Sequence, residues 1–98
     1  MLEDAVFPDR VHSLTKRFHV RAGASTGTHV HTGRIEVLTV LDGEGLLRTG
    51  SESRPFVRGE CASVPAGARH SVHAKTDLHY VSVQIGAEGS EEVLEREG

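Results

Sequence analysis

The fold of this chain is decided by one stretch of its sequence, GASTGTHVHTGRIEVLTVLDG at positions 23–43. Side chains on a β-strand alternate between two faces, so His29 and His31 project from the same face of an extended segment. After Glu36, apolar residues alternate up to an Asp-Gly turn, which also indicates a strand. Two neighbouring strands joined by a short turn around Gly33 would bring both imidazoles and the carboxylate together on one inward face.

Further strands are predicted on both sides of this stretch. About eight short alternating segments are separated by glycine-rich turns, a pattern that is typical of an all-β sandwich or barrel. Inward residues of several strands converge in a barrel, so His70, from a strand at 69–74, can meet the residues of the first stretch. His70 shares its face with Val72 and Ala74, and we therefore expect His73 to point away from it.

The last predicted strand, at 78–85, leaves one question open. His79 and Tyr80 point to opposite faces, so only one of them can line a barrel interior. Aliphatic residues at every second position after His79 favour the His79 face as the inner one. A barrel mouth can also be polar, which would suit the Tyr80 face, and both alternatives stay open.

The length of 98 residues predicts a single domain. We divide it into an N-terminal segment at 1–16 that covers the barrel or a neighbouring subunit, a barrel at 17–86, and an acidic C-terminal tail at 87–98. The tail has no clear strand pattern, so we expect it to be frayed or to form a short helix.

Composition excludes several partners. The net charge of −3 argues against nucleic acid, because phosphate binding needs a basic face. No apolar run approaches the 18 or so residues of a membrane span, and the acidic N-terminus does not resemble a signal peptide, so we expect a cytoplasmic protein. Cys61 is the only cysteine and cannot form an internal disulfide. We interpret it as a small, buried strand residue.

One strand indicates self-association. Residues 35–41 are apolar on both faces, and only one face can line the barrel. Ile35, Val37 and Leu41 therefore need cover that so short a chain can hardly supply. The sequence predicts a homodimer, with the N-terminal segment of the neighbouring subunit as a plausible cover.

Two motifs resemble those of the cupin superfamily. The first is Gly-x5-His-x-His-x4-Glu-x6-Gly over positions 23–43, and the second is Gly-x5-Pro-x-Gly-x2-His over positions 59–70. The 15 residues between them are near the short limit of the family. The second motif usually closes with an Asn where this chain has Ala74. The resemblance implies a small single-domain cupin with a double-stranded β-helix, or jelly-roll, barrel.

The same resemblance implies a metal site. It assigns four ligands of one divalent metal: His29, His31, Glu36 and His70. Imidazole and carboxylate suit Mn, Fe, Co, Ni, Cu or Zn, and four protein ligands on an octahedral ion leave two positions for a small molecule. A closed structural zinc site would use the same four ligands, but a barrel closed by strand pairing does not need a metal for folding.

Two classes of function follow from such a site. One is an enzyme that acts on a small organic molecule, for which the resemblance makes a dioxygenase the first candidate, ahead of a redox-neutral isomerase, lyase, cyclase or decarboxylase. The other is a non-catalytic metal-binding or ligand-binding sensory module. No catalytic residue is identified beyond the ligands, although Glu36 could accept a proton if its pKa were raised. Arg48, Arg58 and Arg69 could orient an anionic substrate, but we interpret them as solvated surface residues.

Overall fold

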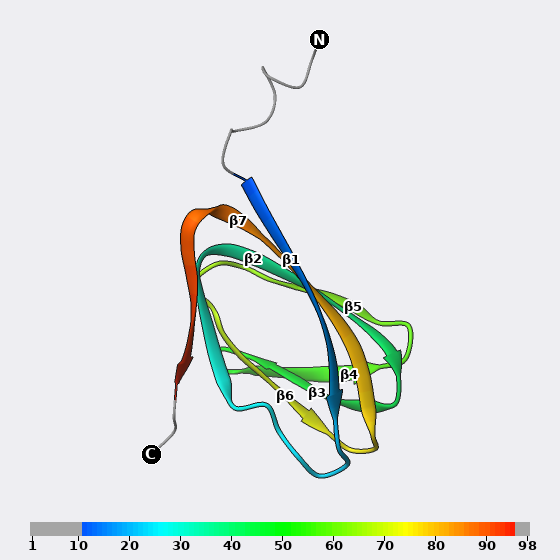
Figure 1. Ribbon diagram of the computed structural model, residues 1–98. Coiled ribbons are helices and arrows are strands. Elements are labelled where there is room, and N and C mark those ends of the chain that lie inside the picture. The colour runs from blue at the N-terminus through cyan, green and yellow to red at the C-terminus, as the bar shows by residue number, and fades with distance from the viewer. Residues whose placement is uncertain (1–10, 96–98) are drawn as a thin grey trace.

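The structure is a computed structural model that describes the backbone of residues 11–95 and the side chains of residues 13–86 (Figure 1). No helix occurs in this part of the chain, which confirms the all-β prediction. Its strands are β1 (Val11–Val20), β2 (Thr28–Asp42), β3 (Glu44–Thr49), β4 (Glu52–Val57), β5 (Cys61–Val64), β6 (Arg69–Ala74) and β7 (Leu78–Glu95). They number seven rather than about eight because β2 and β7 are longer than the pattern indicates.

The strands pair antiparallel and curl into a barrel. Their order is β1-β7-β2-β6-β3-β4, and β5 pairs with β2 outside this path. Figure 1 shows β1, β2, β5 and β7 on one wall and β3, β4 and β6 on the other. Strand β2 pairs with β5, β6 and β7, so it joins the two walls.

The turn predicted around Gly33 is wrong, because β2 is one continuous strand there. Its register with β7 shifts between Thr32 and Arg34, and Gly33 adopts a φ of 72°. His31 and Glu36 are an odd number of residues apart, which would place them on opposite faces of a regular strand. The irregularity at Gly33 resets the alternation, and both side chains are buried inside the barrel.

The barrel interior combines an apolar core with a polar cluster. Alternation along β6 brings His70, Val72 and Ala74 inward as predicted, and His73 is exposed as expected. The apolar core consists of Val20, Leu38, Val40, Leu47, Phe56, Ala62, Val64, Val72, Ala74, Leu78 and Tyr80. The buried polar side chains are His31, Glu36, His70, Ser82 and Gln84.

The burial pattern of β7 shows that Tyr80, and not His79, faces the barrel interior. Tyr80, Ser82 and Gln84 are buried, whereas the residues between them are only partly buried. The aliphatic residues of the sequence favoured the opposite face. The polar side chains are nevertheless inside, because the Ser82 hydroxyl is hydrogen-bonded to Glu36 and the Gln84 amide to Arg34. Val81, Val83 and Ile85 consequently lie on the outer face of β7.

The two ends of the described chain are strands. β1 pairs with β7 from Val11 onward, so the second part of the 1–16 segment belongs to the sheet. Backbone residues 91–95 of β7 pair with the first part of β2, which corrects the expectation of a frayed or helical tail. Residues 1–10 and 96–98 lie outside the described part, and their covering role stays a prediction. Between residues 11 and 95, no helix has the length and hydropathy needed to cross a membrane.

Candidate metal centre

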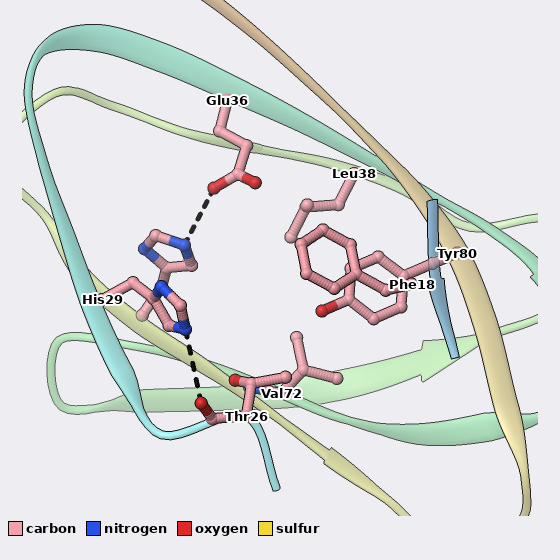
Figure 2. Close-up of a pocket in the computed structure, with 8 residues that line it drawn as sticks. Phe18, Thr26, His29, Glu36, Leu38, Val72 and Tyr80 are labelled. Carbon is pink, nitrogen blue, oxygen red and sulfur yellow. Dashed lines mark hydrogen bonds and ion pairs between the residues drawn. The ribbon is translucent and has the colours of Figure 1, made fainter. Parts of the chain in front are cut away.

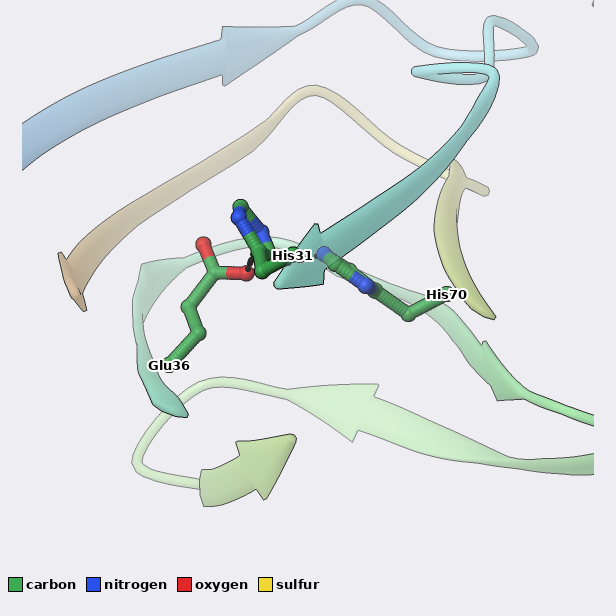
Figure 3. A group of neighbouring side chains, drawn as sticks. All are labelled: His31, Glu36 and His70. Atoms are coloured by element: carbon green, nitrogen blue, oxygen red, sulfur yellow. Dashed lines mark hydrogen bonds and ion pairs between the residues drawn. The ribbon is translucent and has the colours of Figure 1, made fainter. Parts of the chain in front are cut away.

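Three of the four expected ligands converge inside the barrel (Figure 3). His31 and Glu36 come from β2, and His70 comes from β6. The Nε2 atoms of His31 and His70 lie 2.9 Å and 2.8 Å from the same Glu36 Oε1 atom. All three side chains are almost completely buried. Two imidazoles are therefore held against one carboxylate away from solvent.

A tight turn positions His70. Ala68 N–H donates to the Pro65 carbonyl over 3.2 Å, and Gly67 has a φ of 84°. This geometry is that of a type II turn, in which a glycine is favoured at the third position. Gly67 N–H also donates to the His31 carbonyl over 2.7 Å, so the turn is attached to β2 beside a ligand. The second motif thereby fixes the start of β6 next to the first motif.

The carboxylate of Glu36 is strongly stabilised in its ionised form. Burial alone would raise its pKa, but hydrogen bonds from His70 and Ser82 and positive charge on His70 and His31 outweigh the burial. The balance lowers the pKa of Glu36 from 4.5 to about 2. Glu36 is thus an anion throughout the neutral range.

Two buried polar residues of β7 that sequence reasoning did not assign lie beside Glu36, and one of them supports the carboxylate. The Ser82 hydroxyl donates to Glu36 Oε2, the oxygen that does not face the imidazoles. Gln84 lies directly opposite Glu36 in the β2–β7 ladder, and its Oε1 accepts from Arg34 Nη1 over 2.7 Å. The signal was present in the sequence as polar residues at every second position after Tyr80, on the face that the aliphatic pattern disfavoured.

His29 lies beside the cluster rather than in it. It is directly opposite His70 in the β2–β6 ladder, and the two ring centroids are 5.7 Å apart. Its Nε2 faces the Thr26 carbonyl at 3.3 Å (Figure 2). The structure therefore brings His31, Glu36 and His70 together and leaves His29 as their neighbour on the same inner face.

A small cavity of about 20 Å³ adjoins the cluster (Figure 2). One side is polar and the other is apolar, with the Tyr80 hydroxyl directed into the space. The rings of Tyr80 and Phe18 stack with centroids 4.9 Å apart, which holds this wall in place. The cavity is lined by Phe18, Thr26, His29, Glu36, Leu38, His70, Val72 and Tyr80.

The cluster fits a divalent transition metal by its donor chemistry. One ligand atom from each of His31, Glu36 and His70 lies within 4.8 Å of the other two, the only such group of His, Cys, Asp or Glu in the described part of the chain. Imidazole nitrogen and carboxylate oxygen are the donors that Mn, Fe, Co, Ni, Cu and Zn accept. A cation bound between these atoms would replace the protons that now link the imidazoles to the carboxylate.

Other singled-out residues lie outside the cluster. His73 is exposed and its Nδ1 lies 2.8 Å from Ser25 Oγ. The His79 ring stacks on the exposed ring of His19 with centroids 4.2 Å apart, on the outer surface. Cys61 is exposed, so its interpretation as a buried residue is wrong. Side chains on β5 alternate between the two faces, and Ala62 takes the inward position, so Cys61 points outward.

The chain belongs to the cupin family. A family model described as "Cupin domain" matches residues 16–84, which is more than half of the chain. A curated relative, an oxalate-binding protein from Thermotoga maritima, is 31% identical over 74 residues. These residues are 74% of this chain and 61% of the relative, so the chain spans about three-fifths of that protein. The resemblance seen in the two motifs is confirmed.

Solved structures agree with this fold. A protein with a double-stranded β-helix domain from Klebsiella pneumoniae superposes with a TM-score of 0.77 at 19% identity, over 99% of this chain and 96% of that one. A salicylate 1,2-dioxygenase from Pseudaminobacter salicylatoxidans gives a TM-score of 0.71 at 19% identity, over 96% of this chain and 34% of that one. At such identities the likeness concerns the fold alone, and it confirms the predicted double-stranded β-helix.

Proposed function

We propose that this protein is a metal-dependent cupin enzyme that acts on a small organic molecule. His31, Glu36 and His70 would hold one divalent transition metal, with His29 as the fourth ligand. The observation that carries the proposal is the convergence of two imidazole nitrogens on one carboxylate oxygen beside a cavity. Membership of the cupin family supports it.

The residues around the cavity would bind and orient the substrate. Leu38, Val72 and Phe18 supply an apolar wall, which excludes water from one side. The Tyr80 hydroxyl is directed into the cavity and can hydrogen-bond a polar group of the substrate. The bound metal would supply Lewis acidity and, with a redox-active ion, one-electron chemistry.

Glu36 does not suit the proton-accepting role considered from the sequence. That role needs a raised carboxylate pKa, whereas the imidazoles and Ser82 lower the pKa of Glu36 to about 2 despite its burial. We therefore assign Glu36 the role of the anionic ligand, which lowers the charge at the metal. Any proton transfer would use another group of the cavity or the substrate itself.

For the reaction type we propose a dioxygenase. Support comes from the fold, which this chain shares with a salicylate 1,2-dioxygenase, and from a ligand set that leaves positions open on an octahedral ion. The experiment follows oxygen uptake by iron-, manganese- and copper-loaded protein with diketones, catechols, flavonols and thiols. Oxygen consumption that Tyr80→Phe reduces and His73→Ala leaves unchanged is expected. Equal turnover in anaerobic buffer would favour an isomerase, lyase or cyclase instead.

A second candidate is carboxylate binding without turnover. The 20 Å³ cavity is small for an aromatic substrate, and the curated relative is named an oxalate-binding protein. Calorimetric titration of the metal-loaded protein with oxalate, and with acetate as a monocarboxylate control, tests it. Saturable oxalate binding with no product and no oxygen uptake would favour this module over the enzyme.

We also propose that the protein forms a homodimer in the cytoplasm. Ile35 lies directly opposite Ile85, and Val37 lies opposite Val83, on the outer face of β2 and β7. Ile35 is 46% exposed and Ile85 is 39% exposed, which is unusual for such a row in a monomer. A second copy of the chain would cover this face. The lone cysteine is consistent with a reducing compartment.

A further inference from the structure

A second hollow lies on the outside of the barrel, over β3 and its neighbours β4 and β6. Its volume is about 260 Å³. Six residues line it, and none of them belongs to the interior cluster: Ser25, Leu46, Arg48, Ser53, Ser71 and His73. We call this feature the outer groove.

The strand register places one arginine between two hydroxyls. Arg48 on β3 is directly opposite Ser53 on β4 and Ser71 on β6. Directly opposed residues of antiparallel strands lie on the same side of the sheet, with Cβ atoms roughly 5 Å apart. The Arg48 side chain, whose guanidinium carries five N–H donors, thus starts between two serines.

The other end of the groove is held by a loop. Leu46 is opposite His73, and Ser25 forms a bridge to His73 from the segment before β2. The Ser25 hydroxyl oxygen lies 2.8 Å from His73 Nδ1. Gly23 N–H donates to the Ala74 carbonyl over 2.8 Å, which fixes the segment along β6. The groove is therefore pre-formed by backbone pairing.

The groove is positively charged and has no acidic side chain in its lining. Arg48 is the one permanently charged residue among the six. No ion pair joins Arg48 to a carboxylate within the described residues 13–86. An arginine fork without a carboxylate partner is suited to bidentate binding of an oxyanion. Leu46 adds an apolar surface beside the cation.

We infer that the outer groove binds the oxyanion group, carboxylate or phosphate, of a small organic anion. Arg48 would hold two oxygens, Ser53 and Ser71 would donate from either side, and Leu46 would contact the carbon chain. The volume is just below the range of about 300–1,000 Å³ for sites of drug-sized ligands, so the ligand should be small. This site is separate from the proposed metal centre and does not depend on it.

The experiment uses ¹H–¹⁵N spectra of the full chain loaded with zinc, titrated with three probes. Butyrate is the organic carboxylate, butyramide is its uncharged match, and inorganic phosphate tests the phosphate alternative. We expect saturable shifts at the amides of Ser53 and Ser71 with butyrate or phosphate, and none with butyramide. Arg48→Gln should weaken this binding at least about tenfold, because a charge-assisted hydrogen-bond pair is lost. Arg58→Gln, at an exposed arginine outside the groove, is the control and should leave it unchanged.

Three results would overturn the inference. One is the absence of saturable shifts up to about 10 mM probe, a range in which even weak specific sites begin to fill. Another is an equal loss of binding in Arg48→Gln and Arg58→Gln, which would indicate general charge attraction. The third is shifts confined to the amides of His29, Glu36 and Tyr80. That result would place the anion in the barrel interior, so it would support the proposed function while removing the outer site.

Discussion

Around Glu36, the two faces of β2 and β7 reverse the usual pattern of a half-buried sheet. Inside the barrel, the Glu36 carboxylate contacts two imidazoles and accepts from the Ser82 hydroxyl. Outside, Ile35 and Ile85 lie opposite each other and are exposed. An ordinary antiparallel sheet with one solvated face places apolar residues inward and polar residues outward.

We infer from this reversal that each face serves a function in addition to folding. A buried carboxylate with two imidazoles is costly unless it is paired, and the pairing seen here is also the geometry of a cation site. Apolar side chains that stay exposed to water contribute little to folding. Covering them with another surface is favourable, because it removes apolar area from water. The inner face therefore supports the proposed metal site, and the outer face supports the proposed dimer.

The largest expected effect comes from the inner face. His70→Ala removes a ligand, so metal affinity should fall by more than about 100-fold, since even supporting residues around a metal cost about 10–100-fold. His73→Ala changes the outer face of the same strand and should leave metal content unchanged. Elemental analysis of both variants after dialysis against a weak chelator measures the difference. Equal metal retention in the two would contradict the site assignment.

Metal binding by the unchanged protein should also weaken below about pH 6, because imidazole must lose its proton to bind a metal and its ordinary pKa is near 6.5. Repeating the titration at pH 7.5 and 5.5 tests this point. An affinity that does not change between these two values would argue against histidine ligands.

The outer face gives the next effect. Ile35→Lys should weaken the proposed dimer about 10–100-fold, since symmetry places the charge twice in an apolar contact. Leu46→Lys is a matched control, because Leu46 is exposed to a similar extent on the opposite wall. Sedimentation equilibrium at micromolar concentration compares the two variants with the unchanged chain. A clean monomer mass for the unchanged chain would refute the dimer.

The contrast between the faces also explains what the sequence could and could not predict. Local alternation placed Leu38 and Val40 on the Glu36 face and His73 away from His70, because a period of two depends only on neighbouring residues. The alternation failed at Gly33, where an irregularity in β2 shifts which residues face inward. That irregularity arises in the pairing of β2 with β7, which is distant in sequence. The two glycine-framed motifs compensated, since their spacing already contains the irregularity.

The inner face of β7 was the harder case. Aliphatic residues normally point inward, so the pattern favoured the wrong face of the last strand. Only the three-dimensional position of Glu36 shows why Ser82 and Gln84 are buried there. Cys61 was misplaced for a related reason: small apolar character does not determine which of two neighbouring residues faces the core. Polar interiors thus limit predictions that rest on hydropathy alone.

Acid should unfold the metal-free protein partly through the inner face. The pKa of Glu36 in the folded state is about 2, below its ordinary 4.5, so its ionised form stabilises the fold above pH 4.5. This contribution is lost as the pH falls from 4.5 toward 2 and amounts to at most about 3 kcal/mol. Urea midpoints of chelator-treated protein at pH 7, 4.5 and 3 should therefore fall less steeply for Glu36→Gln than for the unchanged chain. Parallel slopes would show that Glu36 is not held as an anion.

The smallest effect should come from Ser82, the residue that links β7 to the carboxylate. Ser82→Ala removes the hydroxyl that donates to Glu36 Oε2, so the pKa of Glu36 should rise and the carboxylate should be less firmly oriented. Loss of such a supporting hydrogen bond is expected to lower metal affinity about tenfold. Ser63→Ala, at an exposed position on the outer face of β5, is the matched control. Competition with a metal-sensing dye separates the two variants, and equal affinities would mean that the buried hydroxyl fills space without orienting the ligand.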